Sequence, residues 1–164
     1  MDLTSFAIGA RHMSGQLPDV KREVLGDTAE AAALSTFRRQ IADLRISLDS
    51  LRLPSGDGVE ARGLPRILGD VGLALNEARE CLEILGPMLE DATRPERAGK
   101  QRSRRQLQDL ASERTRTYTA LDNLEKSIAT FLDHVRVIGI PASRMRRAEV
   151  RAIVPEQNDR RRLA

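Results

Sequence analysis

Apolar residues recur at alternating intervals of three and four along three long stretches of the chain. This spacing places them in a seam along one face of an α-helix, so it predicts three long amphipathic helices. The first seam consists of Leu34, Phe37, Ile41, Leu44, Leu48 and Leu51. The second consists of Leu64, Leu68, Val71, Leu75, Ala78, Leu82, Leu85 and Leu89. The third consists of Leu107, Leu110, Arg114, Thr117, Leu121, Leu124, Ile128, Phe131, Val135 and Ile138.

The ends of the first two helices are marked by glycine and proline. The first helix is predicted to start near Asp27 or Thr28 and to end before Pro54, with PSGDG as the following loop. The second seam is interrupted by Gly86-Pro87. Because proline removes a helical hydrogen bond and clashes with the carbonyl four residues earlier, we expect a kink or break there.

The third helix is preceded by a basic stretch, RPERAGKQRSRR, at residues 94–105. Thr93 and Glu96 fit a capping box, so the stretch is interpreted as the exposed first turns of this helix. Gly139 and Pro141 are expected to end the helix.

The middle of the third seam is polar, because Arg114 and Thr117 stand at seam positions. The neighbouring Ala111 and Tyr118 could therefore rotate inward in that region.

Two flanking regions remain. The N-terminal region keeps roughly the same spacing, through Phe6, Ala10, Met13, Leu17, Val20 and Val24. Gly15 and Pro18 interrupt it, so two short helices are expected rather than one. Residues 141–164 form a separate C-terminal region, predicted to be a short basic helix capped by Ser143 and a disordered tail.

The fold class that follows is all-α. We expect residues 1–140 to form an up-and-down helical bundle of three long amphipathic helices with a short N-terminal helical element. An extended coiled coil with partner chains would bury the same seams. The interruptions at Gly86-Pro87 and Arg114 favour the compact bundle.

Composition excludes several other classes. Aromatic residues make up 2% of the chain and are Phe6, Phe37, Tyr118 and Phe131, too few for an aromatic β-core or a base-stacking surface. Cys81 is the single cysteine, which rules out an intramolecular disulfide and a cysteine-rich zinc site. No apolar run is long enough to span a bilayer, and the N-terminus lacks the pattern of a secretory signal. We expect an intracellular, cytoplasmic protein, with peripheral membrane association as an alternative.

The polar residues give no pattern typical of an enzyme. Four glutamates on the second helix are interpreted as a solvated face: Glu77, Glu80, Glu83 and Glu90. His134 is interpreted as a polar residue at the rim of its seam, and Cys81 as a buried, inert thiol. No catalytic residue, metal ligand, cofactor or small-molecule substrate is predicted.

The charge is unevenly distributed. The net charge is +3, but residues 94–116 carry eight basic and three acidic groups, and residues 140–164 carry seven and three. Such segments attract anionic lipid or nucleic acid. The candidate membrane or anion contacts are Leu3, Phe6 and Ile8 as an apolar anchor, with Arg102, Arg104, Arg105, Arg144, Arg146, Arg147 and Arg151. Nucleic acid is disfavoured because no aromatic residues are interleaved with the basic ones.

Several segments resemble a known family. These are MDLTSFAIGA, LSTFRRQIADLRISLDSL, LNEARECLEILGPMLED, KQRSRRQL and LDNLEKSIATFLDHV, which together span most of residues 1–138. They are similar to the helical N-terminal domains of fungal NLR-like (STAND) proteins, of the HeLo-like and azaphilone-cluster type. The resemblance implies a signalling or interaction bundle, linked in related domains to regulated self-assembly, membrane targeting and cell death. It implies no catalytic residues.

The function predicted from the sequence is that of a non-enzymatic interaction or signalling module. We expect it to act through protein–protein contact. We also expect self-association through apolar seam residues that the bundle itself does not bury. The alternatives are a peripheral membrane-associating bundle of the cell-death type and a nucleic-acid-associated helical protein. Salt dependence discriminates among them, because both charged modes weaken as ionic strength rises and an apolar interface does not.

Overall fold

The computed structural model describes the backbone of residues 1–22, 27–53, 63–94 and 102–137. These residues form four helices: α1 (Leu3–Arg22), α2 (Asp27–Asp49), α3 (Leu64–Thr93) and α4 (Arg104–Val137). No strand occurs within these four ranges. The prediction of an all-α fold is therefore confirmed for the described part of the chain.

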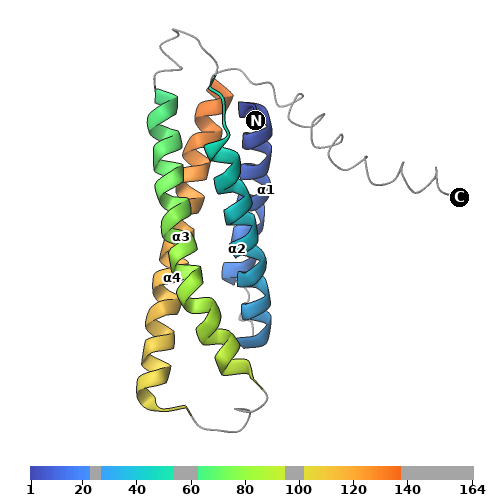
Figure 1. The fold of residues 1–164 in the computed structure, drawn as a ribbon. Helices are drawn as coiled ribbons and strands as arrows, with labels where there is room; N and C mark the ends of the chain where they lie inside the picture. The colour runs from blue at the N-terminus through green and yellow to red at the C-terminus, as the bar shows by residue number, and fades with distance from the viewer. Residues whose placement is uncertain (23–26, 54–62, 95–101, 138–164) are drawn as a thin grey trace, which may run out of the picture.

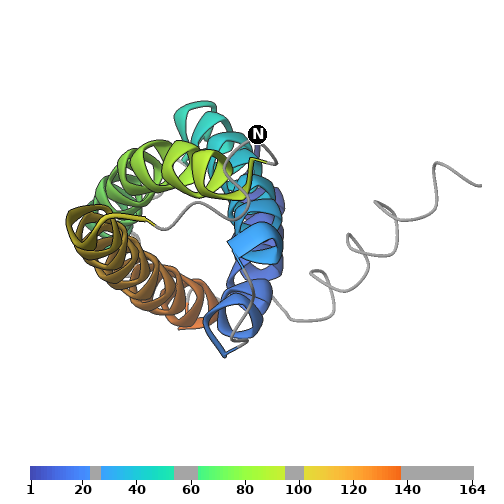
Figure 2. The same ribbon diagram turned by 90° about the horizontal axis from the view of Figure 1, so that it is seen from below.

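The four helices pack side by side as an antiparallel bundle (Figure 1). Each helix runs opposite to the one before it, so α1 and α3 run one way and α2 and α4 the other. Contacts join α1 to α2 and α4, and α3 to α2 and α4. Viewed along its axis, the bundle has a ring arrangement in which α2 and α4 lie diagonally opposite each other (Figure 2).

The N-terminal element is a full helix, which corrects the prediction of two short helices. α1 runs unbroken from Leu3 to Arg22, through Gly15 and Pro18. A glycine and a proline inside a helix disfavour it by about 1 and 3 kcal/mol. Burial offsets this, because Phe6, Ala10, Met13 and Leu17 are all buried on the face that α1 presents to the bundle.

The start of α1 is capped and tied to α2. The backbone N–H of Ser5 donates to Asp2 Oδ1 at 2.7 Å, which makes Asp2 the N-cap. The hydrogen bonds from Ser5 lower the pKa of Asp2. The N–H of Arg52 donates to the carbonyl of Met1 at 3.1 Å, so the beginning of α1 is joined to the end of α2.

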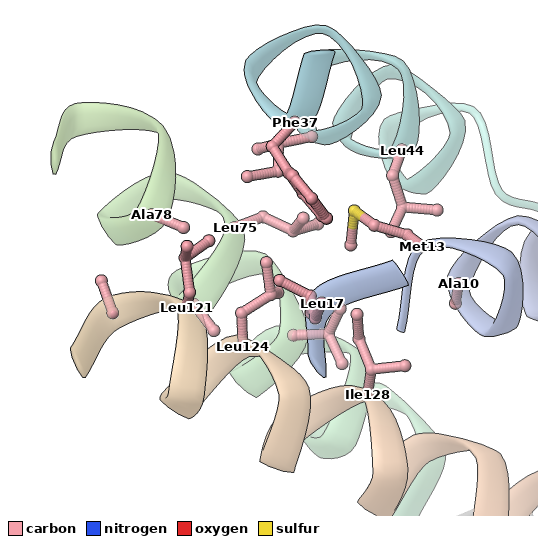
Figure 3. Packing of buried hydrophobic residues seen from close by; sticks show 14 of the residues in the cluster. Ala10, Met13, Leu17, Phe37, Leu44, Leu75, Ala78, Leu121, Leu124 and Ile128 are labelled. Atoms are coloured by element: carbon pink, nitrogen blue, oxygen red, sulfur yellow. The ribbon is translucent and has the colours of Figure 1, made fainter. Parts of the chain in front are cut away.

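The core is built from the predicted seams (Figure 3). All eight residues of the seam on α3 are buried. On α2 the first four seam residues are buried. Leu48, and Leu51 just past the end of α2, are partly buried against the same core. Phe6 of α1 and Phe131 of α4 meet edge to face, with ring centroids 5.2 Å apart.

Gly86-Pro87 does not break α3, so of the two predicted outcomes, a kink or a break, the break does not occur. The helix continues to Thr93, because Leu85 and Leu89 are fully buried on either side of the proline. Pro87 and Glu83 are exposed, so water can hydrate the carbonyl that loses its helical partner. Figure 1 shows the C-terminal part of α3 leaning away from the line of its first turns.

The third predicted helix starts later than expected. Thr93 is the last residue of α3, and its hydroxyl donates to the carbonyl of Glu90 at 3.0 Å. The capping box is formed instead by Ser103 and Gln106. The N–H of Gln106 donates to Ser103 Oγ at 3.2 Å, and the N–H of Ser103 donates to Gln106 Oε1 at 3.0 Å. Residues 95–101, and the C-terminal region predicted at 141–164, lie outside the described residues.

Candidate interaction site

A buried acid lies at the N-terminal end of α2. Glu30 precedes Leu34 by four residues and so continues the seam of α2 by one position. Its side chain is only 7% exposed. A carboxylate at such a position is costly unless it is paired and hydrogen-bonded.

Glu30 is held by two side chains of α4. Arg114 Nη2 donates to Glu30 Oε2 at 2.7 Å, and Arg114 Nε lies 3.0 Å from Oε2 and 3.2 Å from Oε1. The hydroxyl of Tyr118 donates to Glu30 Oε1 at 3.0 Å. The carboxylate therefore receives donors on both oxygens, which compensates its burial. Glu30, Arg114 and Tyr118 are called the ionic cluster below.

The ionic cluster changes the chemistry of its tyrosine. Burial, followed by the negative charge of Glu30, raises the pKa of Tyr118 to about 12. The phenolate is therefore disfavoured, and the protonated hydroxyl serves as a donor to Glu30. The prediction that Tyr118 rotates inward is supported by its half-buried position against the core, whereas Ala111 is exposed.

The ionic cluster lies just past the end of α1. Gln40 of α2 donates to Gln16 of α1 at 2.7 Å. Because the two helices are antiparallel, the end of α1 at Arg22 lies level with about residue 34 of α2. Glu30 is one turn further along. α2 and α4 lie diagonally opposite each other in the bundle. Beyond the end of α1, the side chains of the ionic cluster bridge these two helices.

The first turns of α4 form an exposed end of the bundle. Residues 103–109 are all exposed. Leu107 holds the first seam position of α4 but is 50% exposed, whereas Leu110, the next seam residue, is 4% exposed. Arg104, Leu107 and Ala111 follow one another at intervals of three and four, so they share one face of the helix. These three exposed residues are called the α4 strip below.

The predicted basic contacts differ in their surroundings. Arg102 Nη2 donates to the carbonyl of Ala92 at 3.2 Å, which ties the approach to α4 to the end of α3. Arg104 and Arg105 are exposed. The other four predicted contacts lie outside the described residues: Arg144, Arg146, Arg147 and Arg151.

The predicted apolar anchor is mostly part of the core. Leu3 and Phe6 are buried, and Ile8 is partly buried against the same core. In this structure Leu3 and Phe6 pack inside the bundle and present no apolar surface to a membrane. Among the described residues, every helix is too short or too polar to cross a bilayer.

The remaining polar candidates lie where the sequence indicated. Glu77, Glu80, Glu83 and Glu90 are exposed, and Cys81 is fully buried. Burial raises the pKa of the Cys81 thiol. His134 is half-buried beside Gly63, where an added Cβ would lie 3.3 Å from His134 Cε1. In the described ranges, no three His, Cys, Asp or Glu side chains gather where they could hold a metal ion.

Comparison with protein-family models, with curated proteins and with solved structures found no significant match. The resemblance to the fungal NLR-like domains therefore stays a prediction.

Glu30 is the residue of the ionic cluster that the sequence analysis missed. The first apolar residue of the α2 seam is Leu34, and the same spacing continued four positions earlier reaches Glu30. Two features of the sequence indicated this pairing: an acid at a seam position of one helix and an arginine at a seam position of another.

Proposed function

We propose that this chain is a non-enzymatic helical interaction module that acts by contact with other proteins, including a second copy of itself. The observation that carries the proposal is Leu107. It is a leucine at a seam position that is half exposed at the end of the bundle. We place the protein inside the cell, in the cytoplasm.

The α4 strip has the character of a contact surface. Phe6 lies against Phe131, and α1 and α4 are antiparallel, so α1 ends level with about residue 115 of α4. The strip lies beyond that level and combines a large apolar side chain with a flanking arginine. Arginine and large apolar side chains are common at the centres of protein interfaces, where a partner removes them from water.

The polar groups near the core support a non-enzymatic role. The buried carboxylate of Glu30 is engaged by Arg114 and Tyr118, and the buried hydroxyl of Thr117 donates to the carbonyl of Cys81 at 3.5 Å. These groups join helices to one another. The exposed glutamates of α3 point away from the core rather than into it.

The proposal is tested by sedimentation velocity over a concentration series at physiological salt. Leu107→Asp introduces a charge into the α4 strip, so we expect it to weaken self-association by tenfold or more. Leu73→Asp is the matched control, since Leu73 is 70% exposed but lies on α3, away from the strip. Wild-type protein that stays monomeric at the highest concentration, or equal effects of the two variants, would contradict self-association through this surface.

A further inference from the structure

The ionic cluster joins the charged seam positions of two different helices. From position 30 onward, Glu30 is the only charged residue of the first seam, whose other members are Leu34, Phe37, Ile41, Leu44, Leu48 and Leu51. On α4, Arg114 is the only charged seam residue within the described part of the chain. These two residues are 84 positions apart, and their side chains meet at 2.7 Å.

We propose that the Glu30–Arg114 pair, together with Tyr118, is a register pin: it selects one axial alignment of α2 with α4 over alignments shifted by one heptad.

Apolar seams by themselves distinguish such alignments poorly. A shift of α4 by seven residues moves the helix along its axis by about 10 Å. Each residue of α2 then faces the seam residue of α4 that lies one heptad away from its original neighbour. Most of those replacements exchange one apolar side chain for another. At the level of Glu30, however, the shift would bring Leu107 or Leu121 in place of Arg114. With either shift the buried carboxylate would lose its charged partner. The shift that brings Leu107 to Glu30 would also place the guanidinium at the level of Phe37, among apolar side chains.

Tyr118 sharpens the selection. It lies one turn beyond Arg114 on α4 and donates to Oε1, while the shortest contact of Arg114 is to Oε2. Both oxygens are therefore used by groups with a fixed spacing along α4. A smaller shift, by three or four residues, would also separate the carboxylate from at least one of these donors. The geometry thus matches one alignment only.

The pin is tested by pulsed electron–electron double resonance on spin labels attached to α2 and α4. The labels replace Asp43 and Gln108, which are both exposed and lie at different levels along the bundle, so an axial shift changes their separation. Cys81→Ala leaves the two introduced cysteines as the only labelling sites. Dilution with unlabelled protein restricts the signal to distances within one chain, so the result is independent of self-association.

The pin predicts different results for two matched variants. Glu30→Leu/Arg114→Leu removes both seam charges, and we expect a second distance population displaced by up to about 10 Å, with helical content unchanged. Thr117→Val removes the other polar residue of the same seam, and we expect it to keep the single wild-type distance. A single, unshifted distance in the double leucine variant would overturn the proposal.

A second apolar variant covers the case in which the leucine variant does not fold. Glu30→Met/Arg114→Met keeps unbranched side chains but removes both charges and the groups that hydrogen-bond. A second population displaced in the same way supports the pin, and a single wild-type distance overturns it.

Discussion

At the scale of single residues, the feature with the clearest physical signature is Tyr118. It is the only tyrosine in the chain, and its hydroxyl donates to a buried carboxylate. Both its partial burial and the charge of Glu30 disfavour the phenolate. Its titration therefore reports the ionic cluster without interference from another phenol.

We predict that Tyr118 titrates near pH 12 in the folded protein, against about 10 in the unfolded chain. Because the folded pKa is the higher one, the stabilisation linked to this proton is fully present below pH 10. It is lost as the pH rises toward 12. Ultraviolet absorbance of the phenolate measures the midpoint, with the urea-unfolded chain as reference.

Glu30→Gln is the control for the Tyr118 titration. The variant removes the negative charge but keeps an oxygen that accepts the hydroxyl proton, so the midpoint should fall toward 10 while burial keeps it above that value. A folded wild-type protein that titrates like the unfolded chain would show that the Tyr118 hydroxyl is not held as described.

At the scale of the elements, α1 shows how the local helix propensity of residues competes with burial in the tertiary structure. Gly15 and Pro18 indicate two short helices in the sequence, because both residues disfavour a helix interior. The structure has one helix, since Phe6, Met13 and Leu17 are buried in a single row along it. The cap at Asp2 was not predicted from the sequence, although an aspartate before an apolar periodic segment is a typical N-cap.

We predict that Asp2→Ala lowers the free energy of unfolding by about 1 kcal/mol, because the N–H of Ser5 loses its acceptor. The pKa of Asp2 is lowered in the folded state. Its contribution is therefore present above the unfolded pKa of about 4 and is lost as the pH falls below it. Urea denaturation at neutral and acidic pH measures both effects.

Asp2→Asn is the matched variant for the cap. It keeps an oxygen that can accept the Ser5 N–H but has no charge. It should retain most of the stability at neutral pH and remove the dependence on pH that Asp2 contributes. Equal losses for Asn and Ala would show that the side-chain oxygen does not act as a cap.

At the scale of the whole molecule, the bundle decides which apolar residues face water. Leu3 and Phe6 are in the core, whereas Leu107 and Leu73 are exposed. The membrane alternative drawn from the sequence would require α1 to leave the bundle and expose its buried face. That step would uncover the edge-to-face contact of Phe6 with Phe131 as well.

We predict that the folded protein does not float with neutral vesicles, nor with vesicles rich in anionic lipid at physiological salt. At low salt, weak binding to the anionic vesicles is expected through Arg104 and Arg105, because surface charges are then less screened. Liposome flotation at two salt concentrations measures this. Flotation that survives physiological salt would contradict this prediction, and its loss on deletion of residues 1–13 would show that α1 makes the contact.

The sequence by itself determined the three long helices α2, α3 and α4 and most of their buried faces. Apolar spacing is a property of each helix alone, so the seams of α3, most of α2 and the second half of α4 could be identified without knowing their neighbours. The buried Cys81 and the exposed glutamates of α3 followed from the same helical spacing.

The tertiary structure alone decided which seam positions face which partner. Glu30 is buried because α4 supplies Arg114 and Tyr118 at a distance of 84 and 88 positions in the chain. Leu107 is exposed in the first turns of α4, beyond the end of α1, and α1 is continuous because a row of its residues is buried. Each of these outcomes depends on the relative lengths and axial positions of packed helices, which local spacing along one helix does not contain.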